Sequence, residues 1–225
     1  MGESSGDCPA KRQKAARTAP GPVGARLAAF GHEAGIRRCP VTRIDPLQLP
    51  RRIACMITPD YCQLMAQYNR WMNERLYETC AALTDVERRL ERGAFFGSIH
   101  GTLNHLLWGD RMWLGRFGGP PCTHPQFGAD MFASFDVLRT ERAATDRAML
   151  DWAGQVSAEW LAAPLVYNSV VDRKTRRLPS AIAAVHMFNH GTHHRGQLTT
   201  LLKQAGIDPG VTDLPWLPGV VAMPD

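Results

Sequence analysis

The sequence HMFNHGTHHRGQ, residues 186–197, contains four of the eight histidines of this 225-residue chain. It lies inside a longer pattern of helical periodicity that extends from Ser180 to Ala205. Residues three and four apart share one face of a helix. We therefore expect one face of this helix to carry five polar side chains: His186, His190, His193, His194 and Gln197.

The same face is expected to be apolar before and after the histidines. Ile182 and Val185 begin this apolar stripe, and Leu198, Leu201 and Leu202 continue it. Burying one unpaired polar group costs about 1–3 kcal/mol, so several buried imidazoles need a partner that satisfies them. A metal ion does this directly, because neutral imidazole is a common metal ligand in proteins. The alternative is that one or two histidines are hydrogen-bonded core residues and the others are solvated.

The spacing of His190 and His194 suits one metal ion, because rings at positions i and i+4 converge beside the helix. Two ligands from one helix are not enough, so a third must come from another element. A second predicted helix, residues 98–117, offers His100 and His105. Position along the helix does not choose between these two histidines.

The chain contains four long segments with helical periodicity, at about residues 59–83, 98–117, 134–156 and 180–205. A capping box at Thr84–Glu87 predicts one short additional helix. Two β-rich runs, 165–171 and 175–178, flank a turn at 172–174 and predict a hairpin. We therefore expect an all-α fold, a four-helix bundle with a small β-hairpin before the last helix.

Charge divides the chain into two parts. Residues 1–55 contain ten Lys/Arg and four Asp/Glu, a net charge of +6, whereas the remaining residues contain sixteen and seventeen, a net charge of −1. Residues 1–55 also lack any sustained period, so we predict a disordered basic N-terminal extension followed by a bundle domain at 56–225. The alternatives are a basic arm for acidic partners or a native start at Met56. The charge of the bundle domain gives no sign of a nucleic-acid partner.

The six cysteines are scattered and form no Cys-x-x-Cys pair. The chain shows no secretory apolar segment near its start and no apolar run of the roughly 20 residues needed to span a membrane. Scattered cysteines without an export signal are typical of reduced thiols. We therefore expect a cytoplasmic protein with no membrane partner.

Two stretches stand out as motifs: NHLLWGDRMWL at residues 104–114 and HGTHHRGQ at residues 190–197. They resemble motifs of DinB/YfiT-like proteins. The resemblance covers about residues 57–206 and implies a four-helix bundle that holds a divalent metal ion, often zinc or nickel, on three histidines. Carried over by motif, those ligands are His105, His190 and His194. The resemblance also implies a homodimer.

Three histidine ligands leave a coordination position for water or substrate, whereas a closed structural zinc site normally uses four protein ligands. A metal in such a site can activate a bound water or an incoming thiolate. The resemblance implies a thiol-dependent transferase that joins a low-molecular-weight thiol to a small-molecule electrophile. A metal-assisted hydrolase is the related possibility, and a non-catalytic, stress-related metal-binding bundle is the alternative.

Further polar side chains are candidates for supporting the metal ligands or contacting substrate. His186 and His193 share the ligand face, and either His186 or His100 is a possible fourth ligand. Gln197 and Asp110 are candidates for orienting the imidazole rings. Arg195 stays protonated and cannot bind a metal, so it either forms an ion pair within the bundle or recognises a substrate carboxylate.

Overall fold

The computed structural model describes residues 56–123, 128–170 and 172–220. The predicted disorder of residues 1–55 lies outside this part of the chain. The prediction of a helical bundle is confirmed by four long helices: α2 (Pro59–Ala81), α4 (Ile99–Arg116), α5 (Phe135–Gln155) and α7 (Ser180–Gln204). In the described residues, three short helices accompany them: α3 (Asp85–Arg89), α6 (Ala158–Ala162) and the 3-10 turn η1 (Leu214–Trp216). Among the residues described, no helix has both the length and the apolar character needed to cross a bilayer.

Local sequence signals set the helix ends. The Thr58 side chain accepts a hydrogen bond from the Tyr61 backbone N–H, and a proline follows it as the first residue of α2. The predicted capping box forms in full, with Thr84 and Glu87 each satisfying the other's backbone N–H. After α7, Gly206 adopts a positive φ of 78°, which a residue without a side chain reaches at little cost.

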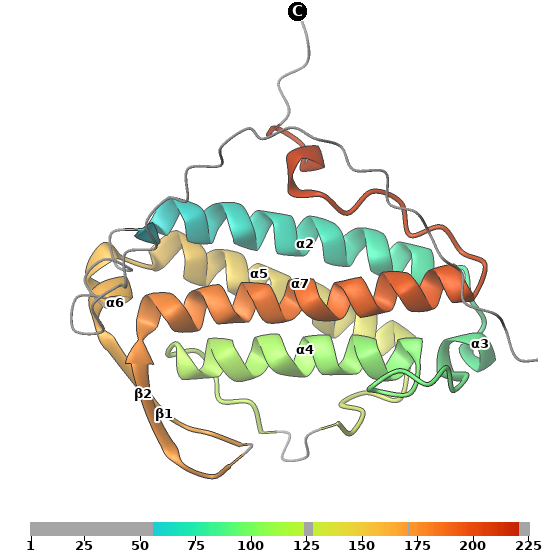
Figure 1. The fold of residues 1–225 in the computed structure, drawn as a ribbon, viewed down its shortest axis with the longest axis horizontal. Helices are drawn as coiled ribbons and strands as arrows, with labels where there is room; N and C mark the ends of the chain where they lie inside the picture. The colour runs from blue at the N-terminus through green and yellow to red at the C-terminus, as the bar shows by residue number, and fades with distance from the viewer. Residues whose placement is uncertain (1–55, 124–127, 171, 221–225) are drawn as a thin grey trace, which may run out of the picture. The chain divides into compact units, whose positions relative to one another are not determined.

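The four long helices pack as a ring in which α2 and α4 each contact both α5 and α7 (Figure 1). The predicted hairpin is confirmed as strands β1 (Pro164–Asn168) and β2 (Thr175–Pro179), paired antiparallel. Strand β1 ends at Asn168, earlier than expected, and the next residue still pairs across the turn, where the Ser169 N–H donates to the Lys174 carbonyl. The hairpin packs against α7, so it forms one wall beside that helix.

A buried polar layer separates two hydrophobic clusters. One cluster includes Leu103, Leu138 and Leu198, and the other includes Trp113, Met149 and Met187. On α4, α5 and α7, polar residues occupy the positions between these clusters. We define the polar layer as Asn69, Asn73, Asp110, Arg142, Asp146 and Arg195.

The prediction of an apolar stripe on the histidine face of α7 was wrong for the first half of that helix. Ile182 is 37% exposed, and Val185 is only partly buried. The buried side of α7 instead carries Ala181, Ala184, Met187, Phe188, Gly191 and Leu198. Small residues on this side let α7 approach its neighbours closely. The histidines of α7 (His186, His190, His193 and His194) therefore lie at the edge of the core rather than at its centre.

Candidate metal centre

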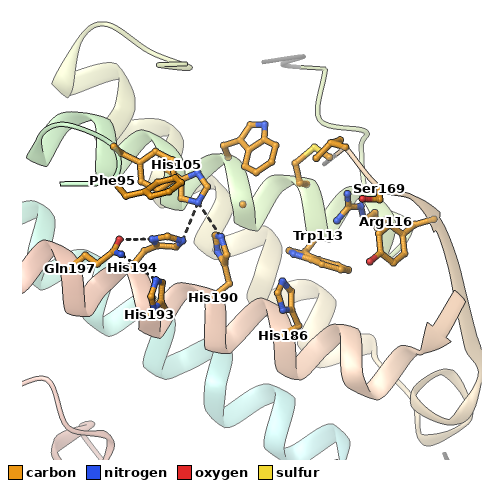
Figure 2. A pocket seen from close by; sticks show the side chains of 16 residues that line it. Phe95, His105, Trp113, Arg116, Ser169, His186, His190, His193, His194 and Gln197 are labelled. Carbon is orange, nitrogen blue, oxygen red and sulfur yellow. Dashed lines mark hydrogen bonds between the residues drawn. The ribbon is translucent and has the colours of Figure 1, made fainter. Parts of the chain in front are cut away.

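Helices α4 and α7 run antiparallel, and their side chains pair in steps of one turn. His105 lies opposite His194, with 3.1 Å between the two Nε2 atoms. Four residues later on α4, Gly109 lies against the ring of His190. Trp113 follows, and its ring centroid lies 4.9 Å from that of His186. The matched step of four residues brings one face of each helix into register (Figure 2).

Three imidazoles converge on one point. The Nε2 atom of His105 lies 3.1 Å from the Nε2 atoms of both His190 and His194. Ligand nitrogens about 2.0–2.1 Å from a tetrahedral metal ion lie roughly 3.3 Å from one another, close to this spacing. The three residues implied by the motifs are therefore those that the structure brings together, and they could hold one metal ion.

His100, the other candidate on α4, lies elsewhere. Its Nε2 atom is 3.0 Å from the Phe132 carbonyl oxygen and 3.5 Å from an Asp130 carboxylate oxygen. Arg89 also contacts this ring. His100 therefore has its own polar partners on the loop before α5, away from the histidine cluster.

The clustered histidines are neutral at physiological pH. Burial lowers the pKa of His105 and of His190 to about 3, and the neighbouring imidazoles act in the same direction. Burial also lowers the pKa of His194. A neutral imidazole has one unprotonated ring nitrogen, which is the form that binds a metal. Within the described residues the cluster contains no carboxylate, so this set of ligands would leave the charge of a divalent ion uncompensated.

Gln197 fixes the orientation of one ring. The Nδ1–H of His194 donates to the Gln197 Oε1 atom over 2.8 Å, which leaves the lone pair of His194 Nε2 facing the other imidazoles. The Gln197 amide nitrogen donates to Nε2 of His193 over 3.2 Å. His193 is exposed and lies outside the converging trio, and its ring also packs on His194, with 4.7 Å between the ring centroids.

Asp110 and Arg195 belong to the polar layer instead. The Asp110 carboxylate pairs with Arg142 over 2.7 Å. The Arg195 guanidinium donates to the Asn69 side-chain oxygen and to Thr192, and it lies over the Tyr68 ring. The sequence offered two roles for Arg195, an ion pair within the bundle or recognition of a substrate carboxylate. In the described part of the chain, its side chain instead has an amide and a hydroxyl as hydrogen-bond partners and forms no ion pair.

Aromatic rings that the sequence did not single out enclose the cluster. The Phe96 ring stacks on His105 with 3.7 Å between centroids, and Trp108 lies 5.6 Å away on the same imidazole. Phe96 precedes α4 in a loop, so helical periodicity gave no signal for it. The sequence did contain a signal for Gly109, because a glycine one turn after His105 lies on the same helix face and predicts a close approach of another group at that point.

A pocket of about 410 Å³ extends from the imidazoles along α4 and α7. Phe95, Phe96 and Trp108 line the end nearest the cluster. Trp113, Arg116, His186 and the hairpin residue Tyr167 also line the pocket. The histidine cluster thus opens into a space that a small organic molecule can enter.

A helical bundle with three converging imidazoles between two antiparallel helices defines a class of candidate metal-binding bundles. Comparison with known proteins agrees: the model of the DinB family matches residues 56–220, and the chain belongs to this family. The chain is also similar to Protein DinB of Bacillus subtilis (strain 168), with 26% identity over 164 residues that cover 68% of this chain and 91% of that protein. No solved structure matches the chain.

Proposed function

We propose that this protein binds one divalent metal ion, with zinc and nickel the first candidates, on His105, His190 and His194, and uses it as an enzyme. The observation that carries the proposal is the convergence of three neutral imidazoles at a pocket of about 410 Å³. A purely structural metal site would need no such pocket. Three protein ligands also leave room for a reactant.

When bound there, a divalent ion would lower the pKa of a coordinated thiol or water and supply a nucleophile at neutral pH. The three histidines contribute no negative charge, which favours binding of an anionic nucleophile. Phe96 and Trp108 place apolar surface beside the ligands, which limits access of bulk water. Gln197 holds the His194 ring with Nε2 toward the site.

We propose that the nucleophile is a low-molecular-weight thiol such as bacillithiol, mycothiol or glutathione, and that the acceptor is a small electrophile. This reaction requires reduced thiols, as in the cytoplasm. Cys62, Cys80 and Cys122 are free thiols, which fits such a compartment. Metal-assisted hydrolysis is the second reaction that the same ligands support.

The first test is elemental analysis of protein purified without a histidine tag. We expect about one divalent ion per chain, as for a single three-histidine site. The His190→Ala/His194→Ala double variant should lose the ion, and the exposed α7 variant Asn189→Ala should retain it. If neither the wild type nor the double variant holds metal after reloading, the histidine row is a hydrogen-bonded part of the core and the proposal fails.

The second test is thiol transfer to an activated aryl chloride. In this reaction a C–S bond forms, chloride leaves and the thiol proton is released. Metal-loaded wild-type protein should accelerate it, and a folded His194→Ala variant should not. Equal rates in the two proteins would exclude thiol transfer at this site. Retained metal without acceleration of thiol transfer or hydrolysis would favour the non-catalytic metal-binding alternative.

We also propose a homodimer, on the basis of the resemblance within the family. Sedimentation equilibrium of the full chain should then give twice the mass calculated from the sequence, 24.9 kDa per chain. A mass equal to that of one chain across the concentration range would contradict this proposal.

A further inference from the structure

We propose that Arg116, held against the rings of Trp113 and Tyr167, binds the carboxylate of an elongated substrate whose other end reaches the three histidines. This inference rests on the proposed function for the reacting end of the substrate. It adds a second recognition point, at the far end of the same pocket, and a chemical class of substrate. That class is an organic anion with an apolar middle.

The first observation is how the Arg116 guanidinium is held. It lies 4.5 Å from the centroid of the Trp113 ring and 4.4 Å from that of the Tyr167 ring. The two rings come from α4 and from strand β1 and contact each other, with 5.3 Å between their centroids, so the guanidinium lies against one paired aromatic surface. Cation–π contacts of this kind leave the edge of the guanidinium, with its N–H donors, available for a planar acceptor.

The second observation is the lack of an acidic partner. Arg111, on the same helix, pairs with Glu141, and Arg142 pairs with Asp110 and Asp146. By contrast, the Arg116 side chain forms no ion pair or hydrogen bond with any residue in the described ranges, and only its ring contacts are found. A half-buried guanidinium without a carboxylate is a site that an anionic ligand would stabilise.

The third observation is that the positive charge of Arg116 acts inside the pocket. Arg116 lines the pocket together with His186, whose ring centroid lies 4.9 Å from that of Trp113. Arginine stays protonated at neutral pH, so this charge is permanent. A carboxylate bound to Arg116 would offset this positive charge.

The fourth observation is the separation of Arg116 from the histidines. Figure 2 shows Arg116 and Ser169 at one end of the pocket, His105 and His194 at the other, and Trp113 between them. Arg116 lies seven residues after Gly109, the position on α4 that faces His190, or about 10 Å along the helix axis. A ligand that reaches both ends must be extended, and its middle must lie against the Trp113 ring.

The geometry also gives the hairpin a role. Tyr167 on β1 contacts both Arg116 and Trp113. Ser169 and Val170, which follow β1, line the same pocket. The hairpin therefore closes the end of the pocket at which the anion would bind, and the helices alone would leave this end open.

A matched pair of probes tests the anion site by binding rather than by turnover. The full-length protein is titrated calorimetrically with 4-phenylbutanoate and with its neutral analogue, 4-phenylbutanamide. A charged hydrogen-bonded pair is worth about 1.5–3 kcal/mol, so wild-type protein should prefer the carboxylate by about tenfold or more. Arg116→Gln should abolish this preference, whereas the exposed variant Arg147→Gln should keep it. Equal preference in wild type and Arg116→Gln, including no measurable binding of either probe, would overturn the inference.

Two further variants separate this inference from the proposed function. A folded His194→Ala variant should lose metal and keep the carboxylate preference, and Arg116→Gln should keep the metal content of the wild type. Loss of preference in Arg116→Gln with no metal in any protein would leave the anion site standing and overturn the metal enzyme. If the wild type holds metal but the carboxylate preference is the same in Arg116→Gln, the anion site is overturned and the proposed metal enzyme stands.

Steady-state kinetics then identify which reactant carries the carboxylate. Arg116→Gln should raise the KM of either the thiol or the electrophile, whichever has the anionic group, more than it lowers kcat. Arg116→Lys should restore part of the loss, because it keeps the charge without the planar fork. Unchanged KM values for both reactants would contradict the inference.

Discussion

Gly109 is the residue of α4 that lies against the candidate metal centre. A Cβ atom at this position would lie 2.4 Å from the Cε1 atom of His190 and 2.9 Å from its Nδ1 atom. The ring of His190 therefore rests directly on the backbone of α4. This contact sets the distance at which His190 faces His105, whereas Gln197 sets the orientation of His194.

Replacing Gly109 with alanine should weaken metal binding without unfolding the helix. Alanine is the better helix former, by about 1 kcal/mol, but its Cβ would push the His190 ring out of position. We expect a loss of metal affinity of about 10–100-fold, similar to the loss of a group that orients a ligand. Competition with a chromophoric chelator measures this affinity.

Gly154→Ala is the matched control for that experiment. Gly154 lies within α5, and no atom lies within 4 Å of a Cβ atom built there. This variant should keep the metal affinity of the wild type and gain slightly in stability. Equal metal affinities in Gly109→Ala and Gly154→Ala would show that the close contact does not position His190.

The polar layer links the helices that carry the site. Arg142 on α5 pairs with Asp110 on α4 over 2.7 Å and with Asp146 over 2.8 Å. Asn73 on α2 donates to the same Asp146 carboxylate over 2.9 Å. The layer thus ties α2 and α4 to α5 at mid-height, close to the level of the histidine cluster.

Replacing Arg142 with methionine should strongly destabilise the protein, because two buried carboxylates would lose their cation. Breaking a buried pair in this way typically costs about 3–5 kcal/mol of unfolding free energy. Arg147→Met, an exposed change on the same helix, should cost little. Urea unfolding followed by circular dichroism measures both values. Similar midpoints for the two variants would show that the layer contributes little to stability.

The whole bundle places three neutral histidines in buried or partly buried positions. In the metal-free protein, burial lowers the pKa values of His105 and His190 to about 3, below the value of about 6.5 expected in the unfolded chain. The unfolded state therefore binds more protons than the folded state between these values. Stability from these groups is fully present above pH 6.5 and is lost as the pH falls toward 3.

Metal-free protein should consequently melt at a lower temperature at pH 5 than at pH 7. The His105→Gln/His190→Gln variant lacks two of the titrating rings and should show a smaller difference between the two pH values. Other ionisable groups are common to both proteins, so the comparison isolates the two histidines. Differential scanning calorimetry after chelation measures the effect, and an equal pH dependence in the two proteins would contradict the neutral cluster.

Short-range sequence signals were enough to predict the elements of the fold. Helix periods, the capping box at Thr84–Glu87 and the hairpin depend on residues close together in the chain, whose local energetics fix the backbone. The pairing of His190 with His194 is local for the same reason. The family resemblance added His105, and the structure brings all three together.

Other features depend on how the helices pack, and the sequence pattern alone did not reveal them. His100 and His105 are five residues apart and point to different sides of α4, so only the neighbours of that helix distinguish them. The buried side of α7 follows its small residues rather than the stripe expected from Ile182 and Val185. The ion pair of Asp110 with Arg142 and the contact of Arg116 with Tyr167 join residues far apart in the chain. Local periodicity carries no information about such distances, because they are set by which side chains fill the space between helices.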